Sequence, residues 1–340
     1  MDFYQLDHDA QVSRLMALAH KALEKWPLDV GQLELIKYRE NAVFKLTTTD
    51  GTPYALRIHR AGYHSDDALR SELQWMGALD EYGVRVPTLV VADNGDTFVS
   101  MQTENPTETR QVDIFEWVDG KQLGSVEEGV ADPAAIKTTY ETIGSLAAQL
   151  HNQATAWQPP AGFTRHAWDA EGIAGEHPFW GPFWKLEQLS PQQRELMIKA
   201  RDRVYSDLKT YGDDPANSER YSMIHADFIA ENLMVDGDLV RLIDFDDAGF
   251  GWHLFELATA LFFEMEQDYY PAAWEALVTG YRQHRSLPDS QLQYMPLFFL
   301  ARSFTYLGWV YTRQETGTTN EQASMLIEKA CGLADQYLGS

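Results

Sequence analysis

The chain has 340 residues, of which 44% are hydrophobic and 12% aromatic, as expected for a globular protein with a large buried core. It carries 27 basic and 51 acidic residues, and the formal net charge of −24 disfavours binding to nucleic acid or to anionic membranes. The single cysteine, Cys331, cannot form an internal disulfide, which suits a reducing compartment.

The N-terminus and the most apolar stretch of the chain indicate where in the cell the protein is expected. The N-terminus is acidic and lacks the basic region and apolar core of a signal peptide. Residues 296–311 are the most apolar late segment, but Arg302 interrupts them and they are too few to span a bilayer. We therefore expect a cytoplasmic protein.

The first part of the chain alternates between helical and strand patterns. Apolar residues recur at helical spacing over residues 11–23. Strand candidates follow at residues 32–38, 42–48, 54–59, 97–101 and 111–118. Asp50-Gly51 joins the second and third candidates as a hairpin turn, and Ser65 is the N-cap of a helix that separates the third from the fourth. These patterns predict a small antiparallel sheet.

From residue 140 onward the pattern is mainly helical. A helix is expected at residues 140–151, closed by a packed or capping His151. Residues 255–266 are largely apolar, and further helices are expected at residues 189–211, 272–281, 292–312 and 320–338. Residues 157–184 are rich in aromatic residues, glycine and proline, so a continuous helix is not expected there. Their aromatic rings either pack or line a pocket for a cationic substrate, and packing is the favoured reading.

Oxygen-bearing side chains cluster around a predicted hairpin in the second half. The runs 233–235 and 239–243 are separated by Asp236-Gly237, a dipeptide suited to a tight turn. Folding the chain there returns Asn232 and Asp244 to one end of the hairpin, with Asp227 on the loop before it. Carboxylate and amide oxygens are ligands that Mg²⁺ prefers, and a carboxylate free of metal can accept a hydroxyl proton. The stretch therefore predicts a phosphoryl-transfer centre.

The motifs in this stretch are specific. His225-x-Asp227-x-x-x-x-Asn232 resembles the catalytic loop of the protein-kinase-like fold, and Asp244-Phe-Asp246 resembles the metal-binding motif that follows it. Together they resemble the aminoglycoside phosphotransferase, choline kinase and type II homoserine kinase superfamily, most of all the homoserine kinase and bacterial stress-response kinase branch. The resemblance implies that Asp227 is the base and that Asn232 and Asp244 hold the metal.

The resemblance also implies a nucleotide site in the first part of the chain. Arg57, on the third strand, stands where a kinase has a phosphate-binding lysine, and Glu72 on the following helix would pair with it. Glu116 and Val118 would belong to the hinge that holds adenine through its backbone. Residues 39–41 take the place of the glycine-rich loop and contain no glycine. Arg57 on an edge-strand surface and a solvated Glu72 are the alternatives.

A further acidic residue, Glu256, stands where the superfamily usually has aspartate. A structural role is favoured, with Glu256 stabilising the loop that carries Asp244.

The expected fold is α+β and protein-kinase-like, with a small antiparallel sheet and one helix in an upper lobe and a larger, mainly helical lower lobe. The expected boundaries are residues 1–113 for the nucleotide-binding lobe, 114–119 for the hinge and 120–340 for the catalytic and substrate-binding lobe.

The implied activity is an ATP- and Mg²⁺-dependent transfer of phosphate to a hydroxyl. The acceptor is open among an amino alcohol resembling homoserine or choline, an aminoglycoside, and a protein serine or threonine. The acidic charge is compatible with a cationic small molecule. A nucleotide-binding pseudokinase is the alternative from a different class, because the glycine-rich loop is missing.

Overall fold

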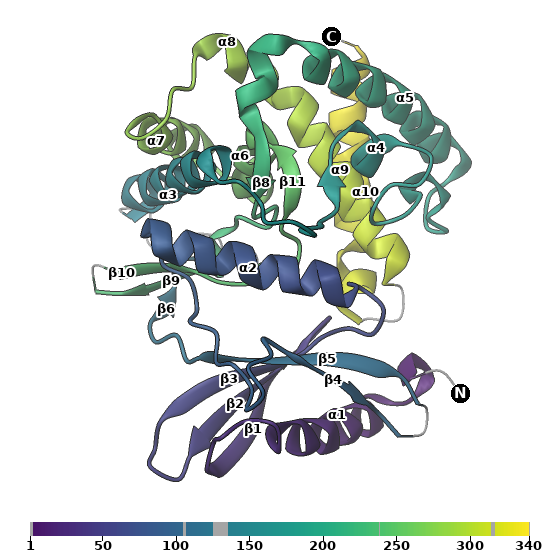
Figure 1. Ribbon diagram of the computed structural model, residues 1–340. Coiled ribbons are helices and arrows are strands. Elements are labelled where there is room, and N and C mark those ends of the chain that lie inside the picture. Colours follow the sequence, from purple (N-terminus) through teal and green to yellow (C-terminus); the bar gives the residue numbers. More distant parts are fainter. Residues whose placement is uncertain (1–2, 105–106, 125–134, 238, 314–316, 340) are drawn as a thin grey trace. The chain divides into compact units, whose positions relative to one another are not determined.

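A computed structural model describes residues 3–104, 107–124, 135–237, 239–313 and 317–339, drawn in colour in Figure 1. The chain forms two compact units. The N-terminal unit comprises Met1–Glu81, Arg85–Asp119 and Pro159–Thr164. The C-terminal unit comprises Tyr82–Val84, Gly120–Gln158 and Arg165–Ser340. No helix in the described ranges combines the length and apolar character needed to cross a bilayer.

The described residues of the N-terminal unit form a five-stranded antiparallel sheet in the order β1-β2-β3-β5-β4. Its strands are β1 (Val30–Tyr38), β2 (Ala42–Thr48), β3 (Pro53–Ile58), β4 (Val99–Gln102) and β5 (Thr109–Glu116). Alternate residues of β2 are buried, so one face of this strand packs in the core. The predicted antiparallel sheet is confirmed.

Helix α1 (His8–Leu23) supplies the apolar layer for this sheet. Asp7 caps it by accepting a hydrogen bond from the N–H of Ala10 at 2.8 Å. Leu15, Leu18 and other residues at helical spacing are buried in one cluster with apolar residues of β2 and β3. Helix α2 (Asp66–Tyr82) begins directly after Ser65, whose hydroxyl accepts from the N–H of Ala68 as predicted.

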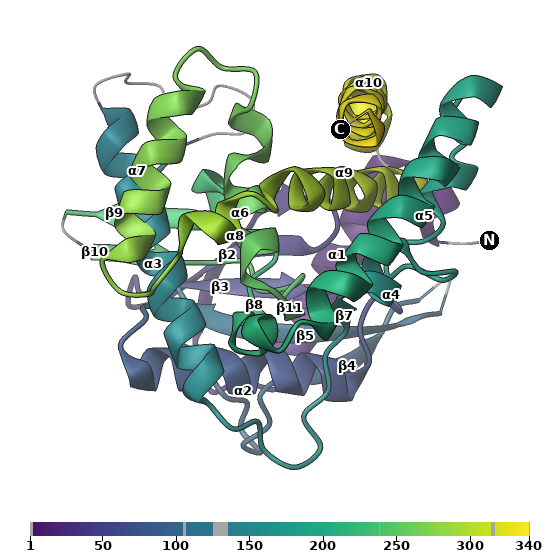
Figure 2. The ribbon, with the colours of Figure 1, turned by 90° about the horizontal axis from the view of Figure 1, so that it is seen from above.

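The C-terminal unit is mainly helical. Its helices are α3 (Ile136–Ala156), α4 (Ala170–Ala174), α5 (Pro191–Asp213), α6 (His253–Leu261), α7 (Tyr270–Arg282), α8 (Asp289–Leu292), α9 (Met295–Thr312) and α10 (Gly317–Leu338), with short 3-10 turns at Phe183–Lys185, Pro215–Arg220, Ala230–Asn232 and Phe262–Glu264. Helices α3 and α7 lie side by side in both ribbon views, and α9 packs against α10 (Figures 1 and 2).

Two three-stranded sheets in the described part of this unit position its loops. One has the order β10-β9-β6, with β6 (Lys121–Gln122), β9 (Leu233–Asp236) and β10 (Leu239–Leu242). The other has the order β7-β11-β8, with β7 (Ala167–Trp168), β8 (Tyr221–Ile224) and β11 (Gly249–Trp252). Pairing of β11 with both partners brings residues 165–168 beside the segment that precedes β11.

Several expected boundaries need correction. The helix expected to end at His151 continues to Ala156, so His151 is buried inside α3 rather than capping it. The long helix expected at residues 292–312 is present as α9, which begins at Met295, and the short helix α8 precedes it. The segment 157–184 is not a continuous helix, as expected, and Trp168, Trp180 and Phe183 are buried.

Candidate active site

The predicted hairpin of the C-terminal unit is present. Strands β9 and β10 pair antiparallel with Leu239 opposite Asp236, and Gly237 has the positive φ of 59° that a tight turn requires. The N–H of Ile243 donates to the carbonyl of Asn232 at 2.9 Å. This bond brings Asn232 next to the residue before Asp244, so both oxygen-bearing side chains lie at the open end of the hairpin.

Asp227 and Asn232 are in direct contact. The Nδ2 group of Asn232 donates at 2.8 Å to both the backbone carbonyl and Oδ2 of Asp227. Because the amide nitrogen is committed to these acceptors, Oδ1 of Asn232 is the atom left to bind a cation. Asp244 is exposed. This donor set is chemically suited to Mg²⁺, which takes one or two protein oxygens together with phosphate oxygens.

His225 joins the loop of Asp227 to that of Asp244. Its Nδ1 accepts from the N–H of Asp227 at 3.3 Å, and its Nε2 lies 3.0 Å from the carbonyl of Ile243. These partners assign the ring hydrogen to Nε2, so that Nε2 donates to the carbonyl. The imidazole therefore fixes the spacing of the two motif loops.

Glu256 of helix α6 holds the backbone just before Asp227. Its carboxylate is fully buried and accepts from the N–H of His225 at 2.8 Å and from the N–H of Ala226 at 2.7 Å. The structural role expected for Glu256 is present, but these contacts lie in the loop of Asp227, not in the loop of Asp244. The sequence could not distinguish the two loops, because both precede α6 in the chain.

Two non-glycine residues of this site have left-handed backbone conformations. The φ angles are 64° for Ala226 and 65° for Asp244. Aspartate tolerates this region better than most residues, whereas alanine gains nothing from it locally. Ala226 is held in place because its own N–H donates to Glu256 and the next N–H, of Asp227, donates to Nδ1 of His225. Strain of this kind is typical of functional loops.

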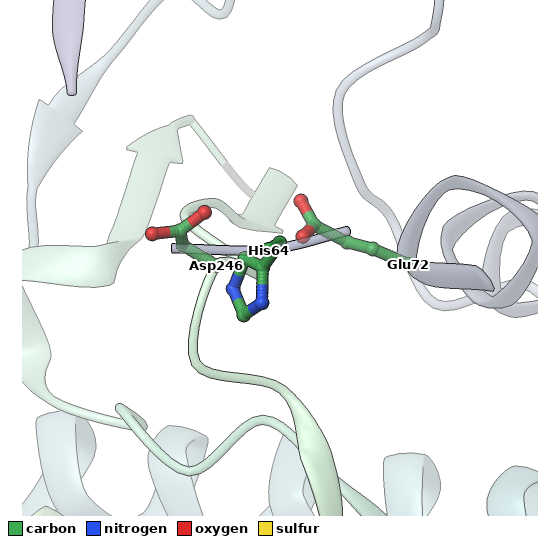
Figure 3. Close-up of side chains that lie close together, drawn as sticks. All are labelled: His64, Glu72 and Asp246. Atoms are coloured by element: carbon green, nitrogen blue, oxygen red, sulfur yellow. The ribbon is translucent and has the colours of Figure 1, made fainter. Parts of the chain in front are cut away.

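The loop after Asp244 is anchored by the segment around β7. Arg165 donates to the carbonyls of Asp246 at 2.6 Å and Ala248 at 2.5 Å, and Trp168 donates to the carbonyl of Asp247 at 3.0 Å. Figure 3 shows the Asp246 side chain on this loop. Arg165 and Trp168 were missed as supporting residues, because only the pairing of β7 with β11 brings them to this loop.

Arg302 of helix α9 is a second residue that sequence reasoning missed. Its side chain is fully buried, and Nη2 lies 3.3 Å from Oδ1 of Asp227. In the sequence it is a charge inside an apolar helix, 75 residues away from its partner. The only available signal was that charge, since a buried arginine generally requires a specific partner.

The N-terminal unit contains a buried ionic cluster around Arg57. Its Nη2 donates to Glu72 at 2.9 Å, and Figure 3 shows the Glu72 side chain extending from α2. The guanidinium also binds Asp113 through two bonds, Nε to Oδ1 at 3.1 Å and Nη2 to Oδ2 at 2.8 Å. Arg57 is therefore buried rather than on an edge-strand surface, and Glu72 is completely buried rather than solvated.

Asp113 completes this cluster and was not identified from the sequence. It lies directly opposite Arg57 in the pairing of β3 with β5, and Oδ2 is 2.9 Å from Nε2 of His59. Burial alone would raise the pKa of Asp113, but Arg57 and His59 outweigh that effect and lower the pKa to about 2. The carboxylate is a permanent anion that fixes the plane of the guanidinium.

Of the expected hinge residues, Glu116 is the last residue of β5 and Val118 lies just beyond it. The N–H of Glu116 donates to the carbonyl of Thr88 at 2.8 Å, so it is committed within the unit. Trp117 packs beneath Lys45, with the ammonium 4.5 Å from the ring centroid, and Val118 is half-buried. The role of Glu116 and Val118 in binding adenine stays a prediction.

The chain matches known proteins over most of its length. The sequence profile of the phosphotransferase enzyme family matches residues 34–291. The solved structure of a microcompartment-associated aminopropanol kinase is 30% identical, with a TM-score of 0.81, and the match covers 95% of this chain and 98% of that one.

Two further similarities concern amicoumacin kinases. The enzyme of Bacillus subtilis (strain 168) is 21% identical over 337 residues, covering 96% of this chain and 92% of that protein. The amicoumacin kinase hAmiN, solved with AMP-PNP, Ca²⁺ and Ami, has a TM-score of 0.76 at 19% identity, covering 97% of this chain and 96% of that one. The matches confirm the superfamily and the kinase-like fold expected from the motifs, and the chain belongs to the phosphotransferase enzyme family.

Proposed function

We propose that this phosphotransferase moves the γ-phosphoryl group of ATP to the hydroxyl of a small amino alcohol, with Mg²⁺ as its metal. The observation that carries the acceptor class is the 30% identity to an aminopropanol kinase over 95% of the chain. The formal net charge of −24 is compatible with an acceptor that carries an ammonium group. We also propose that the enzyme works in the cytoplasm.

Within the C-terminal unit, Asp227 is the proposed base. The acceptor oxygen forms a bond to the γ-phosphorus while the bond from that phosphorus to the bridging oxygen of ADP breaks, and the hydroxyl proton passes to Asp227. Asn232 and Asp244 would hold Mg²⁺, whose chemistry is to neutralise charge on the phosphate oxygens. The contact of Asn232 with Asp227 at 2.8 Å supports a shared arrangement of base and metal ligand.

Within the N-terminal unit, Arg57 would bind phosphate oxygens and Glu72 and Asp113 would orient it. Adenine presents a donor and an acceptor along one edge, so the backbone carbonyl of Glu116 and the N–H of Val118 would suit it. The N–H of Glu116 already donates to Thr88, which is compatible with use of its carbonyl.

The acceptor is tested by measuring ADP formation with Mg²⁺ and ATP across a panel. The panel contains aminopropanol, ethanolamine, homoserine, choline, an aminoglycoside and a generic protein substrate, with phosphorus NMR to identify the product. We expect the highest kcat/KM for an unmodified amino alcohol. A preference for the aminoglycoside or the protein would overturn the proposed acceptor class.

The base is tested separately with Asp227→Asn. This change should abolish transfer while leaving ATP affinity nearly unchanged, because the side chain serves the acceptor rather than the nucleotide. Wild-type turnover in the variant would remove Asp227 from this role.

A further inference from the structure

Helix α9 contains a buried charged residue, Arg302, and a gain in the stability of the fold does not explain its presence. The Arg302 side chain has no exposed surface, and its hydrogen bond to Asp227 is 3.3 Å long. Among the described residues, its Nε and Nη1 groups have no hydrogen-bond partner of ordinary geometry. A buried cation with so few hydrogen bonds lowers the free energy of unfolding relative to an apolar side chain of similar volume.

Three aromatic rings hold this guanidinium in one place. The centroid of Tyr306 lies 4.1 Å from its central carbon, that of Phe255 5.5 Å and that of Trp180 5.7 Å. Burial would lower the pKa of Arg302, but Tyr306, Asp227 and Asp247 together outweigh that effect and raise the pKa, so the side chain stays charged. The rings therefore orient a permanent cation toward Asp227.

The Asp227 carboxylate then has one donor for each oxygen. Asn232 donates to Oδ2 at 2.8 Å and Arg302 donates to Oδ1 at 3.3 Å. Rotation about the last bond of an aspartate side chain is otherwise broad, so two donors on opposite oxygens restrict it strongly. The orientation of a base toward a hydroxyl decides how well it accepts the proton.

We propose that Arg302 is a positioning residue for phosphoryl transfer, which fixes the Asp227 carboxylate and offsets its repulsion from the phosphates of ATP. This inference rests on the proposed role of Asp227 as the base. The two effects have different chemical origins: the orientation comes from the Nη2 hydrogen bond, and the relief of repulsion comes from the positive charge.

Arg302→Met separates this role from a purely structural one. Methionine fills a similar volume without charge, and Asp227 keeps a quarter of its side chain exposed, so its charge stays hydrated. We expect an unchanged or higher Tm, an unchanged KM for ATP and a fall in kcat of about 100-fold, the scale of acid–base contributions. A lowered Tm with wild-type kcat would overturn the proposal.

Arg201→Met is the matched control. Arg201 also stacks on an aromatic ring of the C-terminal unit, with its central carbon 4.5 Å from the centroid of Trp184, and it donates to the carbonyl of Ala174. Within the described part of the chain its hydrogen bonds go to Ala174 and Asp202, neither of them a motif residue, so kcat should be unchanged. A similar loss in both variants would show that general disruption of the unit, and not the contact with Asp227, lowers activity.

Chemical rescue tests directly whether the positive charge of Arg302 is needed for kcat. In Arg302→Ala, millimolar guanidinium should enter the vacated space and restore part of kcat, whereas urea, which has nearly the same shape but no charge, should not. Equal rescue by guanidinium and urea would show that filling the space restores kcat without a charge. That result would overturn the electrostatic part of the proposal. Loss of activity in Asp227→Asn together with full activity in Arg302→Met would reject this inference and leave the proposed function intact.

Discussion

At the scale of single residues, Glu256 has the clearest positioning geometry in the molecule. One buried carboxylate accepts from two consecutive N–H groups, at 2.8 and 2.7 Å, and those groups lead directly into Asp227. Two charge-assisted bonds to a loop with a left-handed alanine offset the strain of that conformation. Glu256 thus positions the backbone that leads into Asp227, the proposed base.

Glu256→Gln should therefore damage both stability and turnover. Glutamine retains one acceptor oxygen, but its NH₂ group would face one of the two N–H donors, leaving a buried donor unpaired. We expect unfolding to require about 2 kcal/mol less free energy and kcat to fall by at least about tenfold. Chemical denaturation and steady-state kinetics measure these effects, with the KM for ATP unchanged.

Glu256→Asp is the informative companion to this variant. It retains the charge and both acceptor oxygens but is one methylene shorter. Its stability and kcat should therefore fall if the carboxylate needs the full length of glutamate to meet both N–H groups. A fully active Glu256→Gln variant would contradict the positioning role.

Asp113 plays a comparable part for Arg57. Asp113→Asn should leave a buried guanidinium with one full negative charge, that of Glu72, instead of two. We expect unfolding to require about 3 kcal/mol less free energy, the size typical of a broken buried pair. If Arg57 binds the nucleotide, the KM for ATP should rise more than kcat falls.

Arg57→Lys provides the comparison for Asp113→Asn. Lysine retains the positive charge but cannot make the planar two-bond contact with Asp113. Nucleotide titration by calorimetry checks both variants. Unchanged ATP affinity in both would exclude Arg57 and Asp113 from nucleotide binding, and the stability measurement would still report on the ion pair.

At the scale of elements, helices α3 and α7 approach each other at glycines. A Cβ atom on Gly280 would lie 2.0 Å from the carbonyl oxygen of Glu141, and one on Gly144 would lie 2.0 Å from that of Leu277. Both obstacles are backbone atoms, so the helices would have to separate. Helix α3 also carries His151 near Glu256, so displacement of α3 should disturb the support of the loop that carries Asp227.

Gly280→Ala should therefore destabilise the C-terminal unit by about 3 kcal/mol, at the upper end of the range for overpacking. Gly332→Ala is the matched control, because that glycine is also inside a helix and a Cβ there meets nothing within 4 Å. It should stabilise by about 0.5–1 kcal/mol through helix propensity. Denaturant titration of both variants measures the difference, and equal effects would contradict the close packing.

The sequence predicted these elements unevenly, for physical reasons. Periodicity identified the long helices and the strands of the N-terminal sheet, since one buried face repeats along each. It did not identify β7, β8 or β11, which are too short to show a period. The motif residues could be identified from the sequence because they lie close together in the chain. Their partners Asp113, Arg165 and Arg302 were not, because strand pairing and helix packing bring them together over long separations.

At the scale of the whole molecule, we expect stability against acid to depend on two buried histidines, His151 and His253. His151 and His253 stack with ring centroids 4.0 Å apart. Nδ1 of His151 lies 2.9 Å from the hydroxyl of Tyr281, and Nε2 of His253 lies 2.8 Å from that of Ser222. Burial is the largest cause of the lowered pKa of each ring, and the pKa of His253 lies well below its ordinary value of 6.5.

Charged groups around the pair act in opposite directions on these pKa values. The carboxylate of Glu256, 3.8 Å from Nε2 of His151, raises the pKa of that ring, whereas Arg285 lowers the pKa of both rings. Arg220 lowers the pKa of His253 as well. Burial exceeds the attraction of Glu256, so the folded protein keeps both rings neutral under conditions in which an exposed histidine begins to ionise.

The pH dependence follows from this difference between the folded and unfolded states. Well above pH 6.5 both states have neutral rings, so the pair imposes no proton-linked cost on folding. As the pH falls below 6.5, the unfolded chain takes up protons that the folded chain resists, and stability is lost by up to about 1.4 kcal/mol per pH unit for each ring. We therefore expect Tm to fall between neutral pH and the onset of carboxylate titration.

The double variant His151→Asn, His253→Gln tests the origin of this loss, because each amide nitrogen or oxygen can replace the ring nitrogen that makes the hydrogen bond. Its Tm should depend less on pH than that of the wild type, even if it is lower at neutral pH. His20→Gln, at an exposed position of α1, is the matched control and should retain the wild-type slope. A double variant with an unchanged slope would assign the acid sensitivity to other groups, since only the buried rings were removed.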